Sequence, residues 1–343
     1  MTMRVLSIGE LWEGGTCLER ARVLAAVGWN VVQFDTTPYK RGGNRIRAGL
    51  QHRLLWGPDV ARFNRDVLQA ARAAGRLDVV WVDKGRWLHA NVLDELKRST
   101  GAVAVHYTPD PAFTVHNSRH FDASVPLYDL CITNKRYELE TYRSKGAREV
   151  LFTWQGIDDR FERIADCGRI DSRPVDVVFV GHAEPHYVTT LESVRSVTEN
   201  LRVHGPGWER IARRRPAWQG IAAEPVWADA FPATLARGRI GMGLLSKLCP
   251  DAFTTRSFEV PAAGAMLLAE RTADHQELFQ EDREAVFFDS ADELRDKLRY
   301  YLSREAIRRR IAEAGRARVL ANYHWRHVLA PAIRRISEMR FAK

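Results

Sequence analysis

The stretch Val175-Asp-Val-Val-Phe-Val-Gly181 gathers β-branched and aromatic residues in a short run that ends at a glycine. Such a run is typical of a buried strand in a parallel sheet, and a helical pattern follows it at Tyr187–Asn200. Further apolar runs alternate with helical stretches on both sides of this unit. Strands separated by helices predict βαβ crossovers, and therefore an α/β fold with largely parallel sheets.

This alternation occurs twice, on either side of the polar segment Asp158–Pro174. We predict strands at Arg4–Ile8, Val31–Phe34, Val79–Val82, Val103–His106, Leu130–Thr133, Glu149–Phe152, Val175–Val180, Leu201–His204, Ile240–Leu244, Ala265–Ala269 and Ala285–Phe288. The predicted helices are Cys17–Val27, Asp59–Ala74, Asn91–Ser99, Arg136–Ser144, Tyr187–Asn200, Ala228–Arg237, Ala273–Gln280, Ala291–Ser303, Glu305–Asn322 and Trp325–Met339. Two Rossmann-like domains are the simplest interpretation. We place them at residues 1–153 and 154–324, with a closing helix at 325–343 that packs back on the first domain.

The composition limits the class of protein without naming a function. Of 343 residues, 45% are hydrophobic and 28% are charged, which excludes a disordered chain. The net charge of +9 attracts anions, whether nucleic acid, anionic lipid or phosphorylated substrates. Four widely spaced cysteines fit a reducing cytoplasm better than a disulfide framework.

The hydropathy pattern predicts a chain without a membrane span. No apolar window approaches the roughly 18 residues that a spanning helix needs. The N-terminus also reaches Glu10 too soon for a secretory signal. We therefore expect a cytoplasmic protein, with peripheral binding at the inner membrane surface as an alternative.

Three glycine-containing turns follow predicted strands, where ligands bind in open α/β sheets. The first holds Gly14 and Gly15, and the next residue, Thr16, could cap a helix. An ordinary βα turn explains this segment equally well, because the spacing is not Gly-x-Gly-x-x-Gly. The other two turns contain Gly181 with His182, and Gly205 with Trp208, whose ring could stack on a base or pack in the core.

The most informative segment is Asp251-Ala-Phe-Thr-Thr-Arg-Ser-Phe-Glu259, followed by Val260-Pro-Ala-Ala-Gly264. We expect Glu259 to open a helix, where its carboxylate could accept two hydrogen bonds from a ribose diol. Thr254, Thr255 and amides at the helix end could hold a diphosphate, with Arg256 as the cation. A capped helix with a glutamate in its first turn explains the spacing without any ligand.

The same segment carries a family resemblance. Arg256-Ser-Phe-Glu-Val-Pro-Ala-Ala-Gly264 and Leu278-Phe-Gln-Glu-Asp-Arg-Glu-Ala-Val-Phe-Phe288 resemble the donor site of GT-B glycosyltransferases. They are nearest to the CgeB-like (spore-maturation-type) relatives of glycosyltransferase family 4. Trp154-Gln-Gly-Ile-Asp158 is similar to the hinge between the family's domains, and Tyr323-His-Trp325 is similar to its tail. The resemblance implies two Rossmann-like domains with parallel sheets that face each other across a cleft.

The resemblance also implies roles for particular residues. Glu259 takes the ribose-binding position, and Asp251 stands where the family has a longer acid that contacts the donor sugar. The family's basic pair after Gly181 is replaced here by His182 and His186, so Arg256 or Lys247 would supply the positive charge.

In the first domain, two residues match family positions. His106 corresponds to a histidine that contacts the sugar, and Asp110 corresponds to an acid to which the resemblance gives no firm role. If the reaction inverts the anomeric carbon, either residue is a candidate base.

Two further patterns have simpler explanations. His116 and His120, like His182 and His186, are one helical turn apart, but neither pair has a third zinc ligand nearby. We therefore expect no metal and no resident cofactor. The stretch Lys40–Arg53 holds five cations and no acid. A solvated loop explains it, and a contact with an acceptor or a membrane surface is the functional alternative.

The resemblance implies a metal-independent glycosyltransferase of the hexosyltransferase type. It would move a sugar from a nucleotide-diphosphate sugar, most of all a UDP-sugar, to a glycan, lipid or small-molecule acceptor, with retention at the anomeric carbon. A GT-B-fold nucleotide-sugar epimerase or hydrolase is the alternative. A basic nucleic-acid-binding protein ranks below both, and we expect no nucleic-acid partner.

Overall fold

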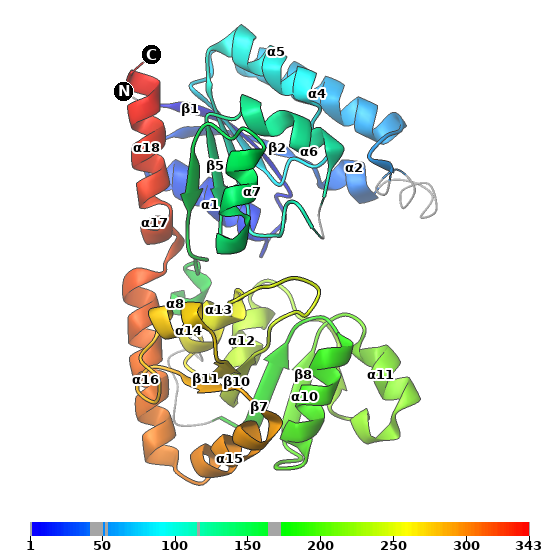
Figure 1. The fold of residues 1–343 in the computed structure, drawn as a ribbon, viewed down its shortest axis with the longest axis vertical. Helices are drawn as coiled ribbons and strands as arrows, with labels where there is room; N and C mark the ends of the chain where they lie inside the picture. The colour runs from blue at the N-terminus through cyan, green and yellow to red at the C-terminus, as the bar shows by residue number, and fades with distance from the viewer. Residues whose placement is uncertain (1, 42–50, 52–53, 115–116, 164–172, 343) are drawn as a thin grey trace. The chain divides into compact units, whose positions relative to one another are not determined.

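The computed structural model describes residues 2–41, 51, 54–114, 117–163 and 173–342. The chain separates into two compact units (Figure 1). The first comprises Met1–Trp154 together with Val328–Lys343, and the second comprises Gln155–His327. Each unit contains one six-stranded sheet in which every strand pair is parallel.

The sheet of the first unit has the strand order β2-β1-β3-β4-β5-β6. Its strands are β1 (Arg4–Gly9), β2 (Asn30–Asp35), β3 (Val79–Asp83), β4 (Val103–Thr108), β5 (Leu130–Thr133) and β6 (Val150–Phe152). Every residue of β3, β4 and β5 is buried, because helices cover both faces of the sheet. Continuous apolar runs in the sequence therefore mark these central strands.

Most helices of the first unit bury apolar residues in its core. The helices are α1 (Thr16–Ala26), α2 (Thr37–Arg41), α4 (Pro58–Ala74), α5 (Ala90–Thr100), α6 (Arg119–Ser124), α7 (Leu139–Ser144) and α18 (Ala330–Phe341), with 3₁₀ turns at Val125–Leu127 and Arg136–Glu138. In α4 the apolar residues Val60, Phe63, Val67, Ala71 and Ala74 are buried, three or four positions apart. This spacing puts them on one side of the helix, where they join the core.

The sheet of the second unit has the strand order β12-β11-β10-β7-β8-β9. Its strands are β7 (Val175–Val180), β8 (Leu201–His204), β9 (Ala222–Ala223), β10 (Gly238–Gly243), β11 (Met266–Glu270) and β12 (Val286–Phe288). Its helices are α8 (Arg160–Arg163), α10 (Pro185–Arg195), α11 (Trp208–Arg214), α12 (Ala230–Ala236), α13 (Arg256–Ala262), α14 (Ala273–Leu278), α15 (Ala291–Leu302), α16 (Glu305–Asn322) and α17 (Trp325–Val328), with a 3₁₀ turn at Pro216–Trp218.

The predicted α/β class and its two Rossmann-like halves are confirmed. The predicted helix Trp325–Met339 is wrong as one element, because it divides into α17 and α18. Pro331 stands in the first turn of α18, where its ring would clash with a preceding turn of continuous helix. The predicted helix Arg136–Ser144 likewise begins as a 3₁₀ turn before α7.

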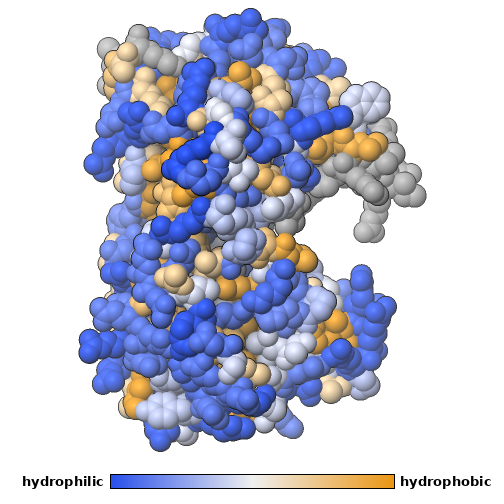
Figure 2. Space-filling model, in the orientation of Figure 1, coloured by the Kyte–Doolittle hydropathy of each residue, from blue (hydrophilic) through white to orange (hydrophobic). Residues whose placement is uncertain are grey.

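The visible surface is predominantly hydrophilic, with apolar side chains scattered over it (Figure 2). Within the described ranges, no helix combines the length and the apolar character that crossing a bilayer requires.

Candidate functional site

The predicted donor residues of the second unit lie in loops at the carboxyl ends of neighbouring strands. β7, β10 and β11 are adjacent in the sheet, and their carboxyl ends meet at one edge (Figure 1). We call this the donor edge, defined by Gly181–Glu184, Leu244–Glu259 and Glu270. Ligands of open α/β sheets bind at such an edge, in the crevice outside the carboxyl ends of the strands.

Gly181 and Gly205 approach each other closely at the donor edge. The Gly181 amide donates to the carbonyl oxygen of His204 at 2.9 Å. Gly205 has a φ of 141°, and a Cβ atom added there would lie 2.1 Å from the Gly181 carbonyl oxygen. Only glycine fits at position 205, so this close approach fixes the turn after β7 against the turn after β8.

Trp208 holds that turn from the core instead of facing a ligand. Its side chain is fully buried and stacks on Trp218, with the ring centroids 5.4 Å apart. The indole Nε1 donates to the carbonyl oxygen of Gly181 at 2.7 Å. The expectation that Trp208 could stack on a base is therefore wrong, because neither face of its ring reaches the surface.

Glu184 is a site residue that the sequence did not reveal. It immediately precedes α10, and its side chain is only 7% exposed. One carboxylate oxygen lies 2.7 Å from Nε2 of His182, and the other accepts a hydrogen bond from the Ser246 hydroxyl at 3.1 Å. Glu184 therefore ties the loop after β7 to the loop after β10.

Glu270, at the end of β11, also connects loops of the donor edge, and the sequence did not reveal it either. Its carboxylate accepts from the Leu245 amide at 2.8 Å and lies 3.4 Å from Nε2 of His186. It also forms an ion pair with Lys247. Lys247 is thus at the donor edge, as predicted, with its charge already compensated.

The helix α13 begins at Arg256, so the expectation that Glu259 opens it is wrong by one turn. Glu259 is the fourth residue and forms an ion pair with Arg256. The Arg256 side chain also donates from Nε to the carbonyl oxygen of Val180, at the end of β7. Its guanidinium carbon lies 4.7 Å from the ring centroid of Phe231. Arg256 therefore links α13 directly to the Gly181 turn.

The two predicted threonines support this arrangement. The hydroxyl of Thr255 accepts from the Arg256 guanidinium at 3.1 Å. The hydroxyl of Thr254 accepts from the Arg256 backbone amide at 3.2 Å, so it satisfies one of the first amides of α13. Both threonines serve α13 in this structure, and the structure places them beside Glu259 as the sequence predicted.

Carboxylates outnumber cations at the donor edge. In the part of the chain that the structure describes, Glu259 pairs with Arg256 and Glu270 pairs with Lys247, while Glu184 and Asp251 lie close enough to act on Tyr187. Burial, and then the charges of Glu184, Glu270 and Asp251, raise the pKa of Tyr187 beside them. We expected Arg256 to supply the positive charge for a diphosphate. In the structure its charge is already balanced by the ion pair with Glu259. Candidate donors are the backbone amides of His182 and Glu184, since those of Gly181 and Ala183 already donate to His204 and Pro206.

The predicted glycines of the first unit lie in the turn between β1 and α1. Gly14 has a φ of 90°, and Gly15 immediately precedes α1. Thr16 is the first residue of α1, so the expectation that its side chain caps the helix is wrong. Gly14 and Gly15 belong to a different unit from every other predicted donor residue.

His106 is a core residue of the first unit. It is fully buried in β4, with Nε2 3.2 Å from the Tyr142 hydroxyl and its ring centroid 4.3 Å from that of Phe121. Burial lowers its pKa to about 3, so the ring is neutral. The proposed roles in sugar contact and as a base are therefore wrong for His106, because no solvent or ligand reaches the ring.

Asp110 lies beyond β4 and forms an ion pair with Lys84 at 2.6 Å. Lys84 directly follows β3 and has a φ of 63°, an uncommon backbone conformation for a lysine. Burial alone would lower the pKa of Lys84, but the Asp110 carboxylate outweighs it and raises the pKa. Both residues line a small cavity with Arg86 and Thr108. Lys84 is thus a candidate acceptor-side residue that the sequence did not reveal.

Some predictions fall outside the described residues. They include His116 and most of the basic stretch Lys40–Arg53. Within the described ranges, no three histidine, cysteine, aspartate or glutamate side chains are grouped so that they could hold a metal ion.

Comparison with known proteins identifies the fold. Residues 188–334 match the family model described as glycosyl transferase-like. No curated protein sequence matches the chain significantly. The sucrose-phosphate synthase of Thermosynechococcus elongatus superposes with a TM-score of 0.72 at 13% identity, over 99% of this chain and 100% of that chain.

Two other solved structures cover nearly the whole chain. Anabaena HepE, in complex with UDP and glucose, has a TM-score of 0.64 at 12% identity, over 98% of this chain and 100% of that chain. A proposed UDP-N-acetylglucosamine 2-epimerase from Listeria monocytogenes has a TM-score of 0.58 at 12% identity, over 100% and 98%. The chain therefore has the GT-B fold of glycosyltransferases, and its residues 188–334 carry a glycosyl transferase-like sequence.

Proposed function

We propose that this chain is a glycosyltransferase that uses a nucleotide-diphosphate sugar, with UDP-sugars as the first class to test. The observation that carries the proposal is the bond from Arg256 Nε to the Val180 carbonyl oxygen. It joins the helix that bears Glu259 to the Gly181 turn, so that a carboxylate and a glycine turn share one edge of the sheet. The match of residues 188–334 to a glycosyl transferase-like family supports the same activity.

In this proposal Glu259 accepts hydrogen bonds from the ribose hydroxyls. Its carboxylate is 15% exposed and is oriented by Arg256. A carboxylate can accept from both hydroxyls of a diol, and each such charge-assisted bond is strong. Arg256 acts as a positioning residue for Glu259, since its own charge is compensated.

The leaving diphosphate gains negative charge as the bond to the sugar breaks. Backbone amides aimed at that charge stabilise it without reorganisation. We assign this role to the backbone amides of His182 and Glu184, just before α10, because the Gly181 and Ala183 amides already donate to His204 and Pro206. The side chains of His182 and His186 would support them. Metal-independent transfer remains our proposal for the same edge.

On the acceptor side, we propose that Asp110 and Lys84 contact the incoming hydroxyl group. The acceptor's identity, as a glycan, lipid or small molecule, stays open in this proposal. Retention at the anomeric carbon also remains a prediction. A retaining reaction of this kind does not require His106 to act as a base.

The experiment is a titration with UDP, GDP, ADP and CMP by calorimetry, with and without magnesium, on the wild type and on Glu259→Gln. We expect one nucleoside diphosphate to bind and the variant to bind it about 100-fold more weakly, because two charge-assisted bonds are lost. Glu313→Gln is the matched control, since Glu313 is an exposed glutamate on α16. Equal affinity of both variants and the wild type would remove Glu259 from the site.

A nucleotide-sugar epimerase is the second candidate. The superposition on the Listeria protein favours it. Product analysis after incubation with a UDP-sugar separates the two. Release of UDP that depends on an added sugar acceptor supports transfer, whereas an epimerised or hydrolysed sugar formed without an acceptor supports the alternative.

A further inference from the structure

A cavity of about 640 Å³ lies in the first unit, where the strands β1 and β3 begin. Arg4 is the first residue of β1, and Asp78 immediately precedes β3, which is paired with β1. Arg340 and Phe341, the last two residues of α18, complete the lining on another side (Figure 1). The charged and apolar residues of the lining are Met3, Arg4, Arg76, Asp78, Arg340 and Phe341.

Asp78 fixes the position of two guanidinium groups at this cavity. One of its carboxylate oxygens accepts from the Arg4 backbone amide at 2.9 Å. The other oxygen accepts from Nε of Arg340 at 3.0 Å and from a terminal nitrogen of Arg76 at 3.5 Å. Burial alone would raise the pKa of Asp78, but these donors outweigh it and lower the pKa. Arg76 and Arg340 therefore meet at one oxygen atom of an ionised carboxylate.

The cavity keeps a surplus of positive charge, because three arginines and one acid line it. In the described part of the chain, Arg4 forms no ion pair, and its Nε is buried without a hydrogen-bond partner. Arg340 donates to Asp78 through Nε alone, so within the same residues both terminal nitrogens of its guanidinium fork keep their donors. The end of α18 adds only a partial negative charge, which the three guanidinium groups outweigh.

Apolar side chains lie beside these arginines. Phe341 is 65% exposed, and Met3 is buried at the same cavity. A phenylalanine ring in water gains free energy when an apolar group covers it. A ligand that suits this cavity therefore has two parts, one that carries negative charge and one that is apolar.

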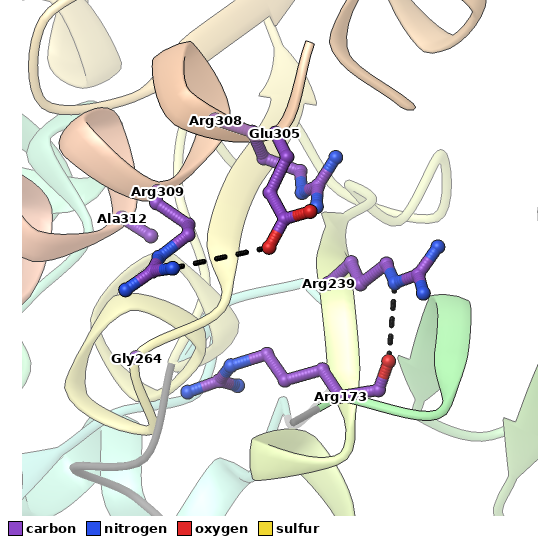
Figure 3. Close-up of a pocket in the computed structure, with 7 residues that line it drawn as sticks. All are labelled: Arg173, Arg239, Gly264, Glu305, Arg308, Arg309 and Ala312. Carbon is purple, nitrogen blue, oxygen red and sulfur yellow. Dashed lines mark hydrogen bonds and ion pairs between the residues drawn. The ribbon is translucent and has the colours of Figure 1, made fainter. Parts of the chain in front are cut away.

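The arginine-lined cavity of the second unit differs in size and in geometry. Its volume is about 30 Å³, which leaves room for about one or two water molecules. Figure 3 shows its guanidinium groups pointing in different directions. Arg239 donates to the Arg173 carbonyl oxygen at 3.1 Å, and Arg309 lies 3.9 Å from the Glu305 carboxylate. These arginines bind groups of the protein itself, whereas the cavity of the first unit has both space and donors for a ligand.

We propose that the cavity of the first unit binds an amphipathic oxyanion, a small molecule whose phosphate or carboxylate group is joined to an apolar chain or ring. The oxyanion accepts from Arg4 and from the terminal nitrogens of Arg340, since a guanidinium fork matches both kinds of group. The apolar part lies against Phe341. A volume of about 640 Å³ is ordinary for a small-molecule site.

This site is separate from the proposed acceptor residues. Asp78 immediately precedes β3 and Lys84 immediately follows it, so the two lie at opposite ends of one strand. The proposal goes beyond sugar transfer and does not depend on it. Its test therefore needs neither a donor nor an acceptor sugar.

The test is a calorimetric titration of the full chain with octyl phosphate and with octanoate, each below its critical micelle concentration. Inorganic phosphate and octanol probe the charged and the apolar part alone. We compare the wild type with Arg340→Gln and Phe341→Ser. The matched controls are Arg72→Gln and Tyr300→Ser, because both side chains are exposed and neither lines the cavity. Circular dichroism verifies that each variant is folded.

We expect the two amphiphiles to bind saturably, about tenfold more tightly than inorganic phosphate or octanol, because each part of the ligand contributes. Arg340→Gln should weaken this binding about tenfold through the loss of a charge-assisted contact. Phe341→Ser should weaken it about tenfold through the loss of apolar contact, with no effect on inorganic phosphate. Both control variants should bind as the wild type does.

The amphiphile that binds more tightly identifies the charged group as a phosphate or a carboxylate. If Arg340→Gln does not fold, Phe341→Ser decides alone, since its side chain is exposed. Absence of saturable binding, or binding that occurs only to micelles, would overturn the proposal. Binding that the cavity variants weaken no more than the control variants do would overturn it as well.

Discussion

His275 makes the second unit sensitive to acid. Its ring is fully buried, with Nδ1 2.7 Å from the Glu270 carbonyl oxygen and Nε2 2.7 Å from the Ser257 hydroxyl. A carbonyl only accepts, so Nδ1 carries the proton and Nε2 accepts from Ser257. The neutral ring thus joins α13 to the last residue of β11, and a protonated ring would lose the bond to Ser257.

The size of the effect follows from the pKa. Burial lowers the pKa of His275 to about 4, against roughly 6.5 in an unfolded chain. The folded state binds fewer protons, so the stabilising contribution is complete above about pH 6.5 and is lost as the pH falls toward 4. Between pH 7.5 and pH 5.0 the loss is about 2 kcal/mol in the free energy of unfolding.

The assay is urea unfolding at pH 7.5 and 5.0, followed by tryptophan fluorescence, for the wild type, His275→Asn and His327→Asn. Asparagine retains a donor near the Nδ1 position but does not titrate. We expect His275→Asn to lose about 2 kcal/mol less than the wild type between the two pH values. His327 is exposed on the surface, so its variant should follow the wild type. Equal pH dependence of His275→Asn and the wild type would refute the reasoning.

Three further substitutions test the donor edge and the first unit. Gly205→Ala should abolish UDP binding and destabilise the fold by several kcal/mol, because its Cβ would lie 2.1 Å from the Gly181 carbonyl oxygen. Gly220→Ala is the control. Gly220 has a φ of 76°, but no atom lies within 4 Å of the added Cβ. Thermal unfolding should therefore show a loss of only about 1 kcal/mol in the free energy of unfolding, from backbone strain. Lys84→Met should lower the rate of sugar transfer while UDP affinity, measured by calorimetry, stays unchanged. A parallel loss of UDP affinity would contradict the acceptor role proposed for Lys84.

The strands were predictable because their signal is local. β5, β7 and β8 begin and end where the apolar runs do. β9 has only two residues, Ala222 and Ala223, too few for any pattern to form. The sequence prediction began α13 at Glu259, whereas the helix begins at Arg256 with Thr255 before it. An acid is favourable anywhere in the first turn of a helix, so Glu259 alone does not mark the first residue.

The site was predicted less completely, because its contacts depend on the order of strands in the sheet. Glu270 meets Leu245 only because β11 lies beside β10. Lys84 meets Asp110 only because β3 lies beside β4 and the chain turns through a left-handed residue. His106 was misplaced for a related reason. Its position at the end of a strand is visible in the sequence, but its depth in an aromatic core is not.

The Gly181 turn has a consequence for how substrate choice can vary in this fold. Trp208 clamps the turn from the core, and Gly205 leaves no room for a side chain. In the proposed function, a preorganised turn of this kind would contact the part of the donor that all nucleotide sugars share, and it would tolerate little change. The proposal then assigns selectivity among donors to the loops after β9 and β10, where Trp227 and Leu248 are 57% and 71% exposed. We therefore expect an exchange of these two loops with those of a related chain to change the donor preference while leaving the Gly181 turn intact.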